Sequence, residues 1–287
     1  MWSKLFQSIF VGIRRRWKRG AGQALAAVGS IWLVTQIAMQ VSEAAKTWLD
    51  QNGTTYFAVV AAAALAWFLI YTYEPRKVRF QIPTTDSFIT VKFGNIFSEQ
   101  CHWMIGVNEF FDGRLGQVIS KNSVHGQFIT RVFHGSEQAF RDAVTNALPK
   151  KRSGKKKRPN LPDVPYPVGT TAVVANGAHK AFLFAMSETD LVTHKASCDV
   201  PMLWTAMAGA LATVRDQGNG EPVAMPLLGN GLSGVNIEPQ HLLRLITLRL
   251  VEFGRKESLP KSVSIVVLDD CFEQLDIREI ARDWKER

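Results

Sequence analysis

The chain has 287 residues, of which 46% are hydrophobic and 21% charged, and this composition excludes a disordered or fibrous protein. The formal net charge is +9, but thirteen basic residues lie in two acid-free segments, residues 1–19 and 150–158. Outside these segments, acidic residues outnumber basic ones by four. The excess charge is therefore local, and we expect no general polyanion-binding surface and no nucleic-acid partner.

Residues 1–20 predict a basic segment in front of a membrane anchor. Apolar residues between Trp2 and Ile13 precede the cluster Arg14–Arg19, a pattern typical of an amphipathic helix that lies along the inner membrane surface. A cleaved signal peptide also has a basic run before an apolar stretch. Here the apolar stretch is long and a second one follows, which favours a retained anchor.

Two uncharged stretches predict a transmembrane hairpin over residues 21–75. Residues 54–73 would form a helix about 30 Å long, the thickness of a bilayer's hydrocarbon core. The alternative, a buried core helix of a soluble domain, seldom lacks charge over twenty residues. Residues 21–41 are more polar, and Gln36 and Gln40 share one helical face that would pack against another helix or line a wet path.

Basic residues flank the hairpin on one side only. Arg14–Arg19 precede the first stretch, and Arg76, Lys77 and Arg79 follow the second, whereas the predicted polar loop between them carries a single lysine, Lys46. The positive-inside rule then predicts a multi-pass protein of the inner cell membrane with both termini in the cytoplasm.

Residues 80–287 predict a cytosolic α/β domain, because short apolar runs alternate with longer helical patterns. Helices are expected from the Ser136 cap to Leu148, from Asp199 to Asp216 and from Glu238 onward. The strands expected for a mixed sheet flanked by helices are Phe88–Phe93, Trp103–Val107, Thr171–Ala175, Ala181–Met186, Pro222–Leu227 and Val263–Leu268.

Residues 149–168 interrupt this domain with five prolines and a basic run, so we expect an exposed loop. Its lysines would either contact anionic headgroups or remain solvated. The three cysteines and most histidines show no ligand spacing, which predicts reduced thiols, no metal and no cofactor. These residues are Cys101, Cys198, Cys271, His102, His134, His179, His194 and His241.

The segment Met225–Val235 holds the most informative motif. It leaves a predicted buried strand, passes three glycines and enters the helix that begins near Glu238. Such a loop brings backbone N–H groups together and can hold a diphosphate, although a simple tight turn has the same composition. It is neither a Walker loop nor the glycine motif of a dinucleotide-binding fold.

With its context, this loop resembles the diphosphate-binding loop of macro domains, and the resemblance covers roughly residues 85–270. Val91–Ile96 resembles the family's first-strand turn, Asn108 matches the asparagine that ends the family's next strand, and Tyr166–Thr170 resembles its short turn. Asn95 replaces the aspartate that reads adenine in the family. The residues after Asn108 lack the stretch of hydrolytic members, so the resemblance implies binding without hydrolysis.

The strings Val107–Asp112 and Asn122–Gln127 resemble a branch in which a macro domain follows two transmembrane helices, as in the membrane effectors of bacterial Thoeris antiphage systems. This resemblance implies that a TIR-domain enzyme makes a signal nucleotide, a histidine–ADP-ribose conjugate. The macro domain would bind it, and a homo-oligomer would rearrange and disrupt the membrane lipid.

We therefore predict a membrane-anchored nucleotide sensor without catalytic residues; the alternatives are a membrane-anchored ADP-ribosyl hydrolase and a membrane scaffold. His125 is expected either to stabilise a polar turn or to contact the ligand, and Asp112 either to cap a helix begun near Gly113 or to contact ribose. The predicted ligand-binding residues are Asn95, Asn108, Glu109, Phe111, Asp112, Ser123, His125, Gly126, Leu228, Gly229, Asn230, Gly231, Leu232, Ser233 and Gly234.

Overall fold

The computed structural model describes residues 2–149, 164–190, 192–193, 195–231 and 234–285. The chain divides into two compact units, one that ends at Arg76 and one that begins at Lys77. Most of the predicted basic loop, including its run of lysines, lies outside the described residues.

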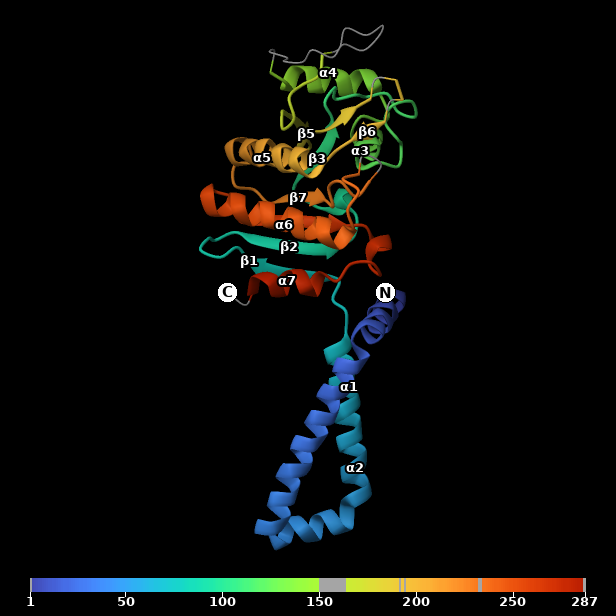
Figure 1. Cartoon of the computed structure of the whole chain (residues 1–287), viewed down its shortest axis with the longest axis vertical. Coiled ribbons are helices and arrows are strands. Elements are labelled where there is room, and N and C mark those ends of the chain that lie inside the picture. Colours follow the sequence, from blue (N-terminus) through green and yellow to red (C-terminus); the bar gives the residue numbers. More distant parts are fainter. Residues whose placement is uncertain (1, 150–163, 191, 194, 232–233, 286–287) are drawn as a thin grey trace. The chain divides into compact units, whose positions relative to one another are not determined.

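The first unit is a pair of long helices, α1 (Trp2–Val41) and α2 (Glu43–Thr72) (Figure 1). Both are long and apolar enough to cross a membrane by length and composition. The predicted basic segment and the first predicted span form one helix, because α1 runs unbroken through residue 20. No proline interrupts this region, and Gly20 packs against α2 instead of ending the helix.

The predicted polar loop between the two spans is also mostly helical. Ser42 caps α2, and its hydroxyl oxygen accepts a hydrogen bond from the Ala45 amide at 3.3 Å. The helix then bends at Asn52, whose φ of −119° and ψ of 17° are not helical. The bend is visible in Figure 1, and it divides α2 into a short segment and a longer apolar one that ends at Thr72.

The second unit is built on one mixed sheet in the order β1-β2-β8-β7-β3-β5-β4. The five inner strands are parallel, while β1 and β4 are antiparallel to their neighbours at the two edges, and β6 pairs with the end of β5. The strands are β1 (Lys77–Gln81), β2 (Phe88–Phe93), β3 (His102–Asn108), β4 (Thr171–Asn176), β5 (His179–Thr189), β6 (Ala196–Ser197), β7 (Val223–Pro226) and β8 (Ser262–Val267).

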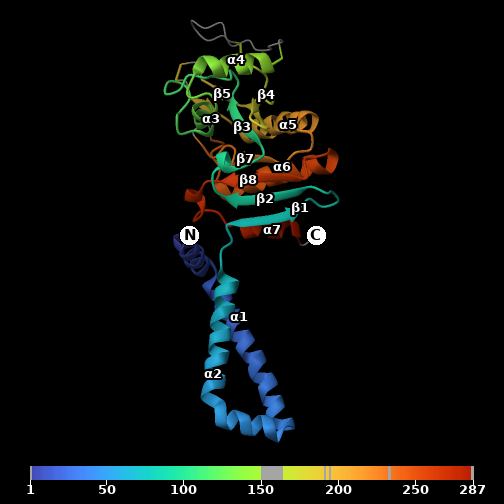
Figure 2. The ribbon, with the colours of Figure 1, turned by 180° about the vertical axis from the view of Figure 1, so that it is seen from behind.

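Helices cover both faces of this sheet (Figures 1 and 2). Successive β3 residues alternate between two cores, since Met104 packs with α5, α6 and α7, whereas Ile105 packs with α3 and α4. The arrangement is a three-layer α/β/α domain. Its helices are α3 (Val124–Val132), α4 (Glu137–Ala147), α5 (Val200–Gln217), α6 (Pro239–Lys256) and α7 (Ile277–Lys285), with short 3-10 turns η1 (Ile96–Ser98) and η2 (Asp269–Cys271).

The predicted fold class is confirmed. All six predicted strands are present, as are α4, α5 and α6. Ser136 and Asp199 cap their helices as expected, accepting hydrogen bonds from Ala139 and Met202 at 3.2 and 2.8 Å. Glu238 precedes α6 but makes no side-chain capping bond. The sequence did not predict β1, β6, α3 and α7.

Candidate functional site

The carboxyl ends of β7, β3 and β5 surround a cavity of about 760 Å³. Ligands of α/β proteins bind at this edge of a parallel sheet, because the loops that follow adjacent strands converge there. The cavity is lined by Gly106, Val107, Asn108, Val118, Ile119, Ser120, Asn122, Ser123, Val124, His125, Met186, Ser187, Thr189, Lys195, Ala196, Pro226, Leu227, Leu228, Gly229 and Gly231.

The predicted glycine loop forms one wall of this cavity. Gly229 has a φ of +78°, and a Cβ there would lie 2.6 Å from Val235 Cγ2, so both its backbone angle and its surroundings require glycine. Its carbonyl accepts a hydrogen bond from the Val235 amide at 3.0 Å, which closes the loop. A Cβ on Gly231 would meet nothing within 4 Å, so this position is open towards the cavity.

The predicted residues of this loop divide into three groups. Leu228, Gly229 and Gly231 line the cavity. Asn230 lies against Cys271, with its Nδ2 3.7 Å from the sulfur, and Gly234 packs within the loop. Leu232 and Ser233 lie outside the described residues.

The start of α3 forms a second wall. The Ser123 hydroxyl oxygen accepts a hydrogen bond from the Gly126 amide at 3.0 Å and caps the helix. A Cβ on Gly126 would lie 2.2 Å from the Ser120 carbonyl oxygen, so glycine allows the preceding loop to pass close to the helix. The prediction of a polar turn at His125 is therefore wrong, because residues 124–127 are helical.

His125 is a buried histidine on the cavity wall. Its side chain packs against Phe140, and burial lowers the pKa of the imidazole to about 4, although the Asp112 carboxylate opposes this shift. Within the described part of the chain, its Nε2 has no hydrogen-bond partner. The ring is therefore neutral at physiological pH.

Asn108 ends β3 in the floor of the cavity, and its amide is held by the protein itself. Its Oδ1 accepts from the Asp112 amide at 3.0 Å, and its Nδ2 donates to Thr189 Oγ1 at 3.3 Å. The next residue, Glu109, is buried, and its carboxylate accepts from the Thr189 amide at 2.9 Å. Glu109 thus joins the ends of β3 and β5 and does not itself line the cavity.

Three more predicted residues lie away from the cavity lining. Asn95 is exposed and caps η1, accepting from the Phe97 amide at 3.0 Å. Phe111 packs edge-on against Tyr166. Asp112 forms a two-point ion pair with Arg114 at 3.0 and 3.1 Å, and no helix begins at Gly113, so the predicted helix cap is wrong.

The third wall was not predicted from the sequence. The β5–β6 hairpin supplies it through Ser187, Thr189, Lys195 and Ala196. The apolar run of β5 ends in the polar triplet Ser187–Thr189, and this change of composition at a strand end was the available signal. Among the residues that the structure describes, no group of three or more histidine, cysteine or acidic side chains could hold a metal ion.

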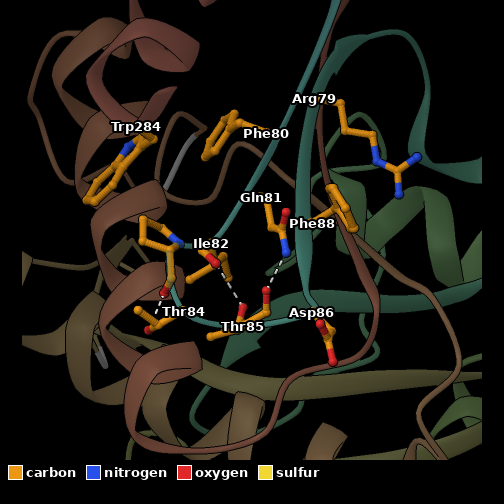
Figure 3. Close-up of a pocket in the computed structure, with 10 residues that line it drawn as sticks. Arg79, Phe80, Gln81, Ile82, Thr84, Thr85, Asp86, Phe88 and Trp284 are labelled. Carbon is orange, nitrogen blue, oxygen red and sulfur yellow. Dashed lines mark hydrogen bonds between the residues drawn. The ribbon is translucent and has the colours of Figure 1, made fainter. Parts of the chain in front are cut away.

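A second cavity, of about 840 Å³, lies between the β1–β2 hairpin and Trp284 of α7 (Figure 3). Arg79 stacks over the Phe88 ring at 4.1 Å on its wall. Phe88 begins β2, so this cavity is at the amino ends of the parallel strands. That position lacks the converging loops of the first cavity, which we therefore take as the candidate site.

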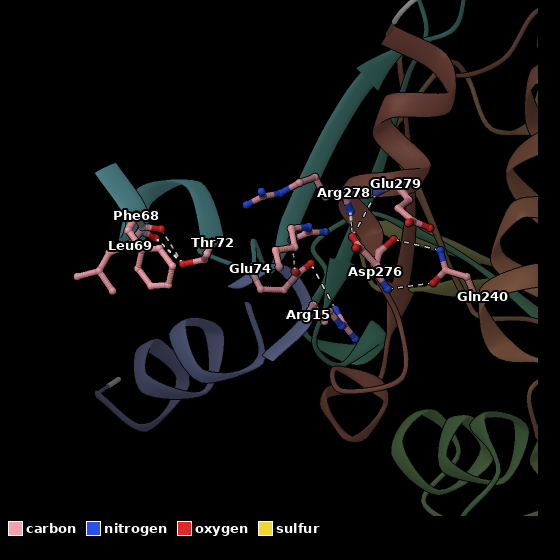
Figure 4. Close-up of polar contacts among 10 residues, drawn as sticks. Arg15, Phe68, Leu69, Thr72, Glu74, Gln240, Asp276, Arg278 and Glu279 are labelled. Carbon is pink, nitrogen blue, oxygen red and sulfur yellow. Dashed lines mark hydrogen bonds and ion pairs between the residues drawn. The ribbon is translucent and has the colours of Figure 1, made fainter. Parts of the chain in front are cut away.

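The helix pair contains its own buried polar cluster, where the chain leaves α2 (Figure 4). Glu74 is fully buried, and its carboxylate lies 2.6 Å from Arg16 Nη1 and 3.5 Å from Arg15 Nη1. The Glu74 amide donates to the Ser8 carbonyl at 3.2 Å, and Arg76 donates to Gln7. We call this set of contacts, Gln7, Ser8, Arg15 and Arg16 with Glu74 and Arg76, the clasp.

Two glycines of α1 allow the clasp to form. A Cβ on Gly12 would lie 1.9 Å from the Thr72 carbonyl oxygen, and one on Gly20 would lie 2.6 Å from Thr72 Cγ2. Thr72 is turned inward, with its hydroxyl donating to the Phe68 carbonyl at 2.8 Å (Figure 4). Small residues at such positions let two helix backbones approach closely.

The family of the chain is decided by its match to a family model. Residues 89–268, from β2 to the residue after β8, match the model described as "Thoeris protein ThsA, Macro domain". The chain belongs to this family. The match lies within the α/β unit and leaves β1, α7 and the apolar helix pair of this Thoeris macro-domain protein outside it.

Solved structures of a macrodomain from Oceanobacillus iheyensis resemble the chain. One with MES bound is 12% identical, with a TM-score of 0.50, and covers 72% of this chain and 98% of its own. A second, with ADP, is 11% identical, has a TM-score of 0.48, and covers 72% of this chain and 93% of its own. A third, a mutant with ADPR, is 12% identical, has a TM-score of 0.47, and covers 72% of this chain and 95% of its own. Comparison with curated proteins gave no match. The predicted macro-domain fold is thereby confirmed.

Proposed function

We propose that this protein is a membrane-anchored sensor that binds an ADP-ribose-type nucleotide in the cavity at the ends of β7, β3 and β5. The observation that carries the proposal is the glycine loop facing the N-terminus of α3 across a cavity, in a chain of the Thoeris macro-domain family. The volume of about 760 Å³ is within the range of ligand sites, about 300–1,000 Å³.

The nucleotide's diphosphate would bind to backbone N–H groups. The loop at Gly229–Gly231 and the start of α3 both present such groups, and the positive end of the α3 dipole adds to the attraction. The Oceanobacillus macrodomain structures with ADP and ADPR support this choice of ligand class.

Binding without turnover agrees with the side chains of the site. Within the described lining there is no aspartate, glutamate or cysteine. The Asn108 amide is engaged by Asp112 and Thr189, and the low pKa of His125 leaves little protonated acid at neutral pH. Hydrolysis of an ADP-ribosyl bond is the competing activity.

The signal would be a histidine–ADP-ribose conjugate made by a TIR-domain enzyme, as the family resemblance implies. Both termini would lie in the cytoplasm, with α1 and α2 in the inner membrane. Moving a population from 1:99 to 99:1 requires about 5.5 kcal/mol of differential affinity, which subunits of a homo-oligomer can share. The helix pairs would then rearrange and disrupt the membrane, causing abortive infection.

Calorimetric titration of the full-length protein in detergent micelles tests the proposal. We expect ADP-ribose or its histidine conjugate to bind, with no product detected by chromatography. Gly231→Trp should abolish binding, because the side chain enters open space in the cavity. Ser258→Trp, an exposed position at the opposite end of β8, is the control. Turnover, or binding retained by Gly231→Trp, would contradict the proposal.

A further inference from the structure

Hydrogen bonds join the described residues of the hairpin that forms the third wall of the cavity. β6 pairs with the end of β5 through Thr189 and Ala196. In the turn between them, the Asp190 amide donates to the Lys195 carbonyl at 2.9 Å. The Asp190 carboxylate accepts from the Val192 and Thr193 amides at 2.9 and 2.6 Å. These bonds set the backbone position of Lys195.

Lys195 has a distinct place among the residues that line the cavity. Among the described residues that line the cavity, it is the only lysine or arginine, and no aspartate or glutamate lines the cavity with it. Its side chain is exposed, and a lysine side chain carries three N–H donors on a flexible stem. A cation in such a wall attracts an anionic ligand group.

The sheet order separates this cation from the glycine loop. The loop follows β7 and the hairpin follows β5, with β3 between them. Two strand spacings amount to about 10 Å. A diphosphate held at Gly229 would therefore lie on the opposite wall from Lys195. In the orientation that the inference assumes, the ligand's far end, beyond the second ribose, extends towards the hairpin.

The floor between the two walls is rigid. Asn108 and Glu109 at the end of β3 both bond to Thr189, with Nδ2–Oγ1 and Oε1–N distances of 3.3 and 2.9 Å. Thr189 is in turn paired with Ala196, the neighbour of Lys195. These buried hydrogen bonds join the end of β3 to the strand that carries the hairpin, so they hold the hairpin in place beside the cavity floor.

We infer that Lys195 is the specificity-determining residue for a carboxylate carried at the far end of the nucleotide, so that the site distinguishes such a conjugate from ADP-ribose itself. This inference rests on the proposed function, since it assumes the diphosphate at the glycine loop. An ammonium–carboxylate contact in a partly enclosed site distinguishes a ligand that carries the carboxylate from one that lacks it. Backbone N–H groups that hold the shared diphosphate cannot make this distinction.

The test compares three probes on the full-length protein: ADP-ribose, histidine–ADP-ribose, and histamine–ADP-ribose, which lacks only the carboxylate. Lys195→Ala should weaken the histidine conjugate about tenfold and leave the other two unchanged. Lys195→Arg should retain most of the preference. Lys261→Ala, an exposed lysine before β8, should change nothing.

The outcomes separate the two proposals. If wild type binds none of the probes, the proposed function fails. If it binds them and Lys195→Ala weakens all three equally, Lys195 contacts the shared diphosphate and the inference is overturned. Unchanged affinity of Lys195→Ala for the histidine conjugate overturns it as well.

Discussion

The Glu74 carboxylate lies 2.6 Å from the Arg16 guanidinium, which precedes it by 58 residues, and both side chains are buried. The contact joins the basic segment of α1 to the residues that follow α2. Residues 73–76 connect α2 to β1, so any force on this connection acts on both helices. In the proposed sensor, the clasp is therefore the element through which the helix pair would respond.

Glu74→Gln should destabilise the helix pair. Removing one partner of a buried ion pair leaves an uncompensated charge, and here two arginines lose their shared carboxylate, at a cost of about 3–5 kcal/mol. Thermal unfolding of the full-length protein in micelles measures the effect. Glu43→Gln, an exposed carboxylate at the start of α2, is the control. Equal unfolding temperatures for both variants would contradict the role of the clasp.

Gly12→Leu should separate the helices, because a side chain at this position overlaps the Thr72 carbonyl. Thermal unfolding of the full-length protein in micelles reports the separation as a lower unfolding temperature. Gly22→Leu has open space around it and should unfold like wild type. An unchanged unfolding temperature of the Gly12 variant would show that the contact tolerates a side chain.

Gly229→Ala and Gly231→Ala should behave differently although they are two residues apart. Alanine at 229 adopts an unfavourable positive φ and contacts Val235, at a cost of about 1–3 kcal/mol, and the loop should distort. We expect ADP-ribose affinity to fall at least tenfold. Alanine at 231 meets no neighbour and should bind nearly as wild type does. The same titration measures both, and equal losses would contradict the loop geometry.

Acidification should destabilise the α/β unit through His125. Its folded pKa of about 4 is below the ordinary value of 6.5, so the unfolded chain binds a proton first as the pH falls. Stability is retained above pH 6.5 and declines towards pH 4, by roughly 2 kcal/mol at pH 5. Denaturant titration at pH 7 and pH 5 should show a smaller decline in His125→Gln. An identical decline would assign the effect elsewhere.

The sequence predicted the buried parts of the fold better than its edges. β7 and β8 are nearly continuous apolar runs, and Ser136 and Asp199 are strong caps. β1 was missed because it is an edge strand in which charged and apolar residues alternate and only Phe80 is buried. α3 was read as a turn because Gly126 and polar residues open it, although the glycine is required by the nearby Ser120 carbonyl.

The site was predictable only in part, for a related reason. The glycine loop is continuous in sequence and could be recognised from its composition. Lys195 and Thr189 reach the cavity because β5 lies two strands from β7, and that order is a property of the assembled sheet. Asn95 and Asp112 have local partners, Phe97 and Arg114, which a motif match does not reveal.

The bend at Asn52 also changes how α2 can be accommodated in a bilayer. The segment Gly53–Thr72, 20 residues, is about 30 Å long and suffices to cross the hydrocarbon by itself. In the proposed topology, the nine residues before the bend would run along the outer leaflet, where Trp48, half exposed, favours the headgroup region. A change in tilt of the crossing segment would then move this arm through the lipid on the far side, and in the proposed sensor a nucleotide bound on one side of the membrane would perturb the opposite leaflet.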